Sequence, residues 1–166
     1  MQDFIFKQID DETYALMSYR GDEVHVTIPD TYQGKPVTVV FDMVFKGHTE
    51  LESVQIPDTV TDLGGFLFDG CSNLKQVDLP ACLHNLWQYC FVRSGIESVH
   101  IPDGVTELVP FTFKDCKNLT SVTGGANLKR VRGYAFQGCD ALKSLEFDNT
   151  TVDIADNAFE EKELNT

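Results

Sequence analysis

The sequence of 166 residues has no long hydrophobic run and is poor in positive charge. A membrane-spanning helix needs about 20 consecutive apolar residues, so we expect no membrane span. Lys and Arg total 13 against 26 Asp and Glu, which gives a formal net charge of −13. Nucleic-acid binding requires positive side chains that neutralise phosphates, so we expect no nucleic-acid partner. The acidity indicates a well-solvated surface or, alternatively, a cationic partner.

The first residues, Met1-Gln-Asp-Phe-Ile-Phe-Lys7, lack the basic segment and apolar run of a secretory signal. For the sequence as it stands, this predicts a cytoplasmic location. A leader removed from the chain would change that expectation.

Motifs for catalysis and metal binding are also missing. None of the four histidines lies in a Gly-x-Ser-x-Gly or His-Glu-x-x-His setting. No Cys-x-x-Cys pair occurs among the five cysteines, which disfavours zinc. We therefore expect no enzyme, no cofactor and no metal.

What the sequence does have is a repeat of 22 or 23 residues. Copies open at Leu51, Leu74, Ile96, Leu119 and Leu142. Two further columns of apolar residues keep the same register: Phe45, Phe68, Phe91, Phe113, Phe136 and Phe159, and Val54, Val77, Val99, Val122 and Leu145. A fixed period in the twenties predicts a solenoid of stacked coils.

Three of the cysteines, Cys71, Cys116 and Cys139, fall in one column of this repeat, which carries His48 and Ser94 in the other coils. A position shared by Cys, Ser and His is typical of a buried free thiol and not of a disulfide framework. Adjacent coils would still bring Cys116 and Cys139 close, so a pair between them is the alternative.

The motif Leu-x-x-Val-x-Ile-Pro, followed by Val-x-x-Leu and Phe-x-x-Cys, resembles the bacterial leucine-rich repeat called BspA-like, from about Val24 to Phe159. The resemblance implies a leucine-rich repeat solenoid that serves as an interaction scaffold. It also implies adhesion or host interaction at a bacterial surface, and thus a cell-surface or secreted location.

The predicted architecture is a right-handed solenoid. Its Val-x-Ile segments should form one parallel sheet on the concave face, with short 3₁₀ or α turns on the convex side. Residues 1–22 predict an N-terminal β-hairpin cap, residues 23–159 about six coils, and residues 160–166 a charged tail. Five extra residues within Asp30–Val37 predict a turn.

The first candidate binding surface is the concave sheet. Because side chains alternate along a strand, every second residue of each strand should face outward. The predicted contact residues are Gln55, Gln76, Asp78, His100, Thr123 and Glu146. The alternative is that these polar groups bond to one another between coils.

The second candidate is an aromatic column two residues before the column Phe. It comprises Phe66, Tyr89, Phe111 and Tyr134, with Trp87, the single tryptophan, beside it where other coils carry Gly64, Val109 and Arg132. Tyr, Phe and Trp are enriched at protein interfaces, so the column predicts a binding strip. Stacked rings that merely cover the convex surface are the alternative.

The sequence thus favours a non-enzymatic protein-recognition module. One alternative is a small intracellular scaffold that forms a homodimer through the C-terminal end of the solenoid or through the aromatic strip. The other is a carbohydrate-binding module that uses the aromatic column, which would require exposed rings in a groove.

Overall fold

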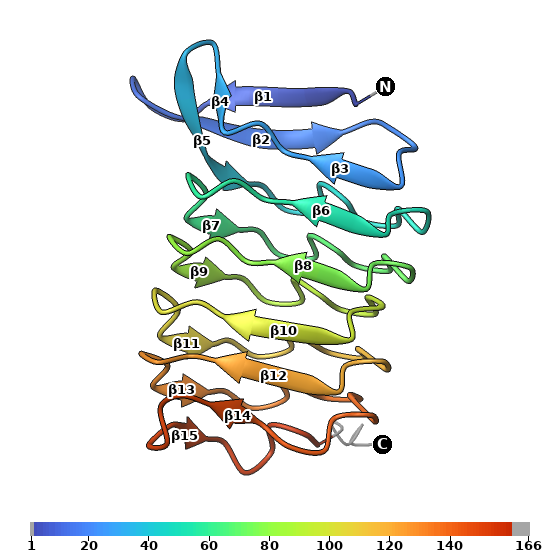
Figure 1. Ribbon diagram of the computed structural model, residues 1–166, viewed down its shortest axis with the longest axis vertical. Coiled ribbons are helices and arrows are strands. Elements are labelled where there is room, and N and C mark those ends of the chain that lie inside the picture. The colour runs from blue at the N-terminus through green and yellow to red at the C-terminus, as the bar shows by residue number, and fades with distance from the viewer. Residues whose placement is uncertain (1, 161–166) are drawn as a thin grey trace, which may run out of the picture.

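The computed structural model describes residues 2–160 as a straight stack of coils built from short strands (Figure 1). Each regular coil contributes one strand to the front of the stack and one to the rear. The front strands are β3 (His25–Thr27), β6 (Ser53–Gln55), β8 (Gln76–Asp78), β10 (Ser98–Ile101), β12 (Ser121–Gly124) and β14 (Glu146–Phe147). The rear strands are β7 (Asp62–Leu63), β9 (Asn85–Leu86), β11 (Glu107–Leu108), β13 (Arg130–Val131) and β15 (Asp153–Ile154). The predicted solenoid is confirmed.

Parallel pairing in register puts each repeat position above its equivalent. Val54 pairs with Val26 on one side and Val77 on the other, and Ser98 pairs with Ser121. The valines at the centres of these strands are buried because they point into the coil, while their polar neighbours face solvent.

The interior is a stack of phenylalanine rings. Phe68 lies 5.6 Å from Phe45 and 5.2 Å from Phe91, measured between ring centroids, and the stack continues to Phe159. The rings from Phe45 to Phe136 are fully buried. Such a stack replaces the single central core of a globular domain, because each coil buries its apolar face against its neighbours.

The N-terminal hairpin is also confirmed. β1 (Phe4–Gln8) and β2 (Tyr14–Tyr19) pair antiparallel, and β2 then runs parallel to β5 (Lys35–Val40) at the head of the rear strands. Tyr19 packs its ring 5.3 Å from Phe45, at the end of the phenylalanine stack. The hairpin therefore covers the first coil.

The predicted turn in the first coil is a complete hairpin. β4 (Thr31–Tyr32) pairs antiparallel with β5 around Gln33 and Gly34, which both have positive φ (50° and 77°). Two successive positive φ angles are typical of the tight two-residue turn that joins antiparallel strands.

The predicted turns of 3₁₀ or α helix are wrong: the rear of the coils holds no helical turn within residues 2–160. Two-residue strands and turns occupy it instead. Backbone bonds spaced by three residues occur, such as Lys46 N–H to Met43 O (3.0 Å), but a left-handed residue interrupts each set. A helix cannot continue through a left-handed residue. Residues 2–160 contain no helix that could cross a bilayer.

Both sets of strands are interrupted at one coil boundary, which we call the seam. The front strands therefore form two parallel sheets and not the single sheet that the sequence predicts. Within the described residues, β8 does not pair with β10, and β9 does not pair with β11. The turn before β10 is one residue shorter than its equivalents, since Ser94-Gly95-Ile96 replaces the four-residue pattern Cys71-Ser-Asn-Leu74. Backbone bonds still cross the seam elsewhere, for example from Phe91 N–H to Thr112 O (2.9 Å). The coils at the seam are therefore held by fewer bonds.

Candidate functional site

The aromatic column predicted from the sequence is a second ring stack, parallel to the phenylalanine stack. Tyr89 lies 4.6 Å from Phe66 and 4.9 Å from Phe111, with ring planes within 8° of parallel, and Tyr134 extends the stack at 5.4 Å. The four rings are partly exposed. Because their faces cover one another, mainly the ring edges meet solvent.

An unusual backbone holds this column outward. Its residues, together with Met43 in the first coil, have φ between 55° and 65°. A bulky side chain in this left-handed region is rare and costs roughly 1–3 kcal/mol. Stacking contributes about 0.5–1.5 kcal/mol per ring pair and offsets part of that cost. The left-handed backbone therefore accompanies a column of rings at the surface.

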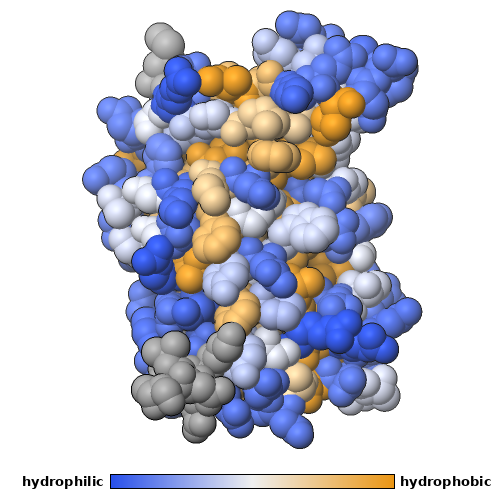
Figure 2. Space-filling view, turned by 180° about the vertical axis from the view of Figure 1, so that it is seen from behind, coloured by the Kyte–Doolittle hydropathy of each residue, from blue (hydrophilic) through white to orange (hydrophobic). Residues whose placement is uncertain are grey.

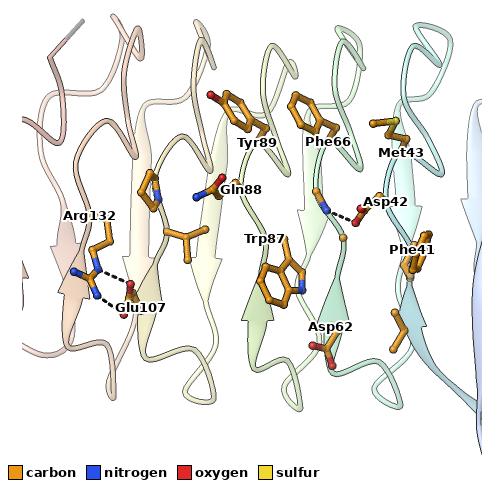
Figure 3. Close-up of a pocket in the computed structure, with 16 residues that line it drawn as sticks. Phe41, Asp42, Met43, Asp62, Phe66, Trp87, Gln88, Tyr89, Glu107 and Arg132 are labelled. Carbon is orange, nitrogen blue, oxygen red and sulfur yellow. Dashed lines mark hydrogen bonds and ion pairs between the residues drawn. The ribbon is translucent and has the colours of Figure 1, made fainter. Parts of the chain in front are cut away.

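Beside the column the surface forms a long hollow, of about 1130 Å³, which we call the rear groove. Figure 2 shows it from behind the front strands, as apolar side chains gathered between hydrophilic margins. In Figure 3 one row holds Met43, Phe66 and Tyr89, and a second row holds Phe41, Trp87 and Arg132. Phe41, Met43 and Trp87 are 46%, 51% and 53% exposed, which marks them as free apolar surface.

Three residues of equivalent repeat position shape the floor of the rear groove. Phe41, Gly64 and Trp87 follow each other at intervals of 23 residues. A Cβ on Gly64 would lie only 2.5 Å from the backbone nitrogen of Asp42, so glycine is required where these two neighbouring coils approach. The result is a gap between two exposed aromatic side chains.

Acidic side chains line the same groove. An Asp42 Oδ1 accepts a hydrogen bond from Gly65 N–H (2.8 Å), and the Asp62 carboxylate accepts one from Asn85 Nδ2 and one from Thr61 Oγ1, both at 2.7 Å. These bonds fix the orientation of both carboxylates.

The opposite end of the groove holds an ion pair. Arg132 donates to Glu107 through Nε (2.5 Å) and Nη2 (3.3 Å). This two-point contact raises the pKa of the Arg132 guanidinium, through its hydrogen bonds with the Glu107 carboxylate and their charge attraction.

The predicted contact residues of the front face form local polar pairs. His100 Nδ1 lies 3.1 Å from Thr123 Oγ1, Gln76 Nε2 donates to Asp78 Oδ1 (3.1 Å), and Thr27 Oγ1 donates to Gln55 (3.5 Å). All are exposed except Thr123, which is half-buried; Glu146 is exposed as well. The hollow over these strands is only about 230 Å³.

The cysteine column has a structural role. The thiols of Cys71, Cys116 and Cys139 donate to the carbonyl of a column Phe in an earlier coil, at 2.9–3.0 Å. All five cysteines are free. Burial raises the pKa of the Cys71 thiol to about 12, so it is neutral near pH 7 and a poor nucleophile.

Residues 38–165 match the family model of the BspA type leucine-rich repeat region in six copies. The chain belongs to the BspA-type leucine-rich repeat family. Leucine-rich repeats typically form non-enzymatic binding scaffolds, and family and fold together support a protein-interaction module.

The BspA-type chain is similar to solved bacterial structures. The T. pallidum leucine-rich repeat protein TpLRR matches with a TM-score of 0.72 and 25% identity, over 91% of this chain and 82% of that one. A leucine-rich repeat protein of Bacteroides ovatus matches at 0.66 and 22%, over 96% and 49%. The pneumococcal vaccine antigen PcpA matches at 0.71 and 18%, over 85% and 35%. The chain thus spans about half of the second protein and a third of the third. No curated protein matches.

Sequence reasoning found part of the rear groove of this BspA-type protein. It singled out Phe66, Trp87 and Tyr89, which line the groove, but also Phe111 and Tyr134, which stack on the column outside the groove lining. The groove is also lined by Phe41, Asp42, Met43 and Asp62, which are not among the predicted contact residues. A signal for Phe41 exists, because it stands 23 residues before Gly64 and 46 before Trp87.

Proposed function

We propose that this BspA-type protein recognises a protein partner through the rear groove. The observation that carries the proposal is the gathering of Phe41, Met43 and Trp87, each about half exposed, in one hollow of about 1130 Å³. Aromatic residues and methionine are enriched at the centres of protein interfaces. Exposed apolar groups that lie together mark contact sites, whereas isolated ones carry no such meaning.

The shape of the groove favours an extended segment of the partner. Its walls come from successive coils, so equivalent side chains recur along the stack at about 4.8 Å. The front face offers less, since its polar groups pair with one another and its hollow is small. Carbohydrate binding along the aromatic column has less support, because stacking hides the ring faces on which a sugar would lie.

A peptide library displayed on phage and selected on the wild-type protein tests the proposal. Selected peptides should bind Trp87→Ser and Phe41→Ser variants at least about 30-fold more weakly, as expected for the loss of an interface anchor. Ile5→Ser is the matched control, since Ile5 is 38% exposed but lies in β1, outside the groove. Circular dichroism would verify that each variant folds. Equal binding by wild type and Trp87→Ser would refute the groove as the contact surface.

A second candidate contact, with a second copy of this chain, lies at the last described coil. Phe159 ends the phenylalanine stack and is 44% exposed, and Ile154 of β15 is 39% exposed. The remaining tail, residues 161–166, lies outside the described residues. Light scattering over a range of concentrations would detect a dimer, and Phe159→Ser should abolish it.

Adhesion at a bacterial surface remains a prediction from the family resemblance. The pneumococcal relative is named a vaccine antigen, but at 18% identity it supports the fold alone.

A further inference from the structure

We infer that the gap between Phe41 and Trp87 is a subsite for an arginine side chain of the partner. The inference rests on the proposed function and names the chemistry of its central contact. The subsite comprises Phe41, Trp87, Asp42 and Asp62, with Gly64 as its floor.

The backbone spacing across the gap leaves room for a flat cation. Phe41 and Trp87 stand two coils apart, which corresponds to about 9.6 Å of backbone separation. A planar group in contact with a ring on each side needs roughly 7–8 Å. Gly64 places no side chain between them, and the Asp42 carboxylate stands beside its Cα. Guanidinium is planar and stacks on aromatic faces, which ammonium does not.

The charges around the gap select a cation. In Figure 3 the Asp42 and Asp62 carboxylates lie on opposite sides of the space between Phe41 and Trp87. The hydrogen bonds that they accept come from neutral groups: the Gly65 amide, the Asn85 amide and the Thr61 hydroxyl. Each carboxylate oxygen has a further lone pair that can accept from a guanidinium N–H.

The protein itself contains the guanidinium–carboxylate part of the contact that we infer. Glu107 occupies the repeat position of Asp62, two coils further along, and its guanidinium partner Arg132 follows 25 residues later. The residue 25 positions after Asp62 is Trp87. Trp87 therefore stands relative to Asp62 where Arg132 stands relative to Glu107. Asp62 has no arginine of this chain at that position, and the partner would supply the guanidinium.

The fluorescence of Trp87, the single tryptophan, reports on the subsite directly. The probes are the blocked tripeptide acetyl-Gly-Arg-Gly-amide and its citrulline analogue, which has nearly the same shape but no charge. We expect a saturable change with arginine and at least about 10-fold weaker binding of citrulline, because the charge-assisted hydrogen bonds are lost. Equal responses to both probes, or none to arginine, would overturn the inference.

Charge variants complete the test. Asp42→Asn keeps the oxygen that accepts from Gly65 N–H, and Asp62→Asn keeps one of the two oxygens that accept from Asn85 and Thr61. Each variant should weaken arginine binding by about 5-fold or more. Asp103→Asn is the matched control, since it removes the same charge at an exposed site outside the groove and should leave binding unchanged. Unchanged binding by Asp62→Asn and Asp42→Asn would contradict the subsite.

The inference and the proposed function can fail separately. Phage peptides that depend on Trp87 but carry no arginine would retain the groove as a protein-binding surface and refute the arginine subsite. Binding of the arginine probe without any selected peptide would support the subsite and contradict protein recognition.

Discussion

Arg93 donates two hydrogen bonds to Asp69, which lies one coil earlier. Its Nε (3.0 Å) and Nη2 (2.6 Å) both reach the carboxylate oxygen Oδ1. Asp69 is 2% exposed, and Lys46 approaches its other oxygen at 3.4 Å. Three consecutive coils are thus joined by one buried charge with a cation on each side. A buried carboxylate requires such partners, because burial removes its hydration.

Arg93→Ala should lower the free energy of unfolding by about 2–3 kcal/mol, since it leaves the Asp69 carboxylate with Lys46 alone. Urea denaturation measures the change. Arg130→Ala, at an exposed site, is the control and should stay within about 0.5 kcal/mol. An equal decrease in the free energy of unfolding for both variants would show that the Arg93–Asp69 ion pair does not stabilise the fold.

Asp115→Gly should stabilise the protein by up to about 1 kcal/mol. Asp115 has φ 57° at the repeat position where Gly47, Gly70 and Gly138 stand with φ between 72° and 77°. Its ion pairs with lysines are partly exposed and contribute little.

Gly70→Ala is the reciprocal variant and should destabilise by about 1 kcal/mol, although an added Cβ meets nothing within 4 Å. Backbone conformation alone would cause that loss. Thermal unfolding of both variants checks the pair, and an unchanged midpoint for Gly70→Ala would contradict the argument from φ.

The stability of the protein should fall as the pH rises above 9. Burial raises the pKa of the Cys71 thiol from its ordinary value of 9.0 to about 12. Between these values the unfolded chain has lost the proton and the folded chain retains it, so alkaline pH favours unfolding by up to about 1.4 kcal/mol per pH unit. Below pH 9 both states hold the proton and the effect vanishes.

Cys71→Ser isolates this contribution, because serine occupies the equivalent position at Ser94 and keeps a hydroxyl donor for the Phe45 carbonyl. The stability difference between wild type and variant should be constant from pH 7 to 9 and should decrease from pH 9 to 10.5. A difference that stays flat to pH 10.5 would show that the thiol titrates alike in both states.

Backbone amide hydrogens in the coil after the seam should exchange with solvent faster than the amides at the same repeat position in the following coil. Arg132 N–H donates to Leu108 O (2.9 Å) and Trp87 N–H to Leu63 O (3.1 Å), but within residues 2–160 Val109 N–H makes no such bond to Leu86. Hydrogen exchange read by NMR should therefore show lower protection for Val109 than for Arg132. Equal protection would mean that the seam closes in solution.

The fold was predictable because each coil repeats the same burial. The leucine that opens a repeat, the valine at the strand centre and the column Phe recur in phase, and all three point inward. The prediction failed for the rear side of the coils, where residues with a left-handed φ, such as Phe66, stand in place of a helical turn. No residue preference reveals that backbone, since phenylalanine and tyrosine rarely adopt it.

The candidate site was predictable only where aromatics recur in a column. Met43, Phe66 and Tyr89 share one position, so periodicity brings them together. The residues opposite them do not repeat, since Phe41, Gly64 and Trp87 differ in size, and the gap arises from that difference. Periodicity predicts the residues that recur in every coil, whereas the gap depends on a repeat position at which the residue differs between coils.

The seam has a mechanical consequence. Under tension along the long axis of the stack, load passes from coil to coil through the bonds that link them. At this one boundary the front and rear strands carry none of it, so the turn-side bonds, such as Phe91 N–H to Thr112 O, bear the force. The protein would yield there first and part into two blocks, and the rear groove, whose walls span that boundary from Trp87 to Glu107, would be pulled apart with them.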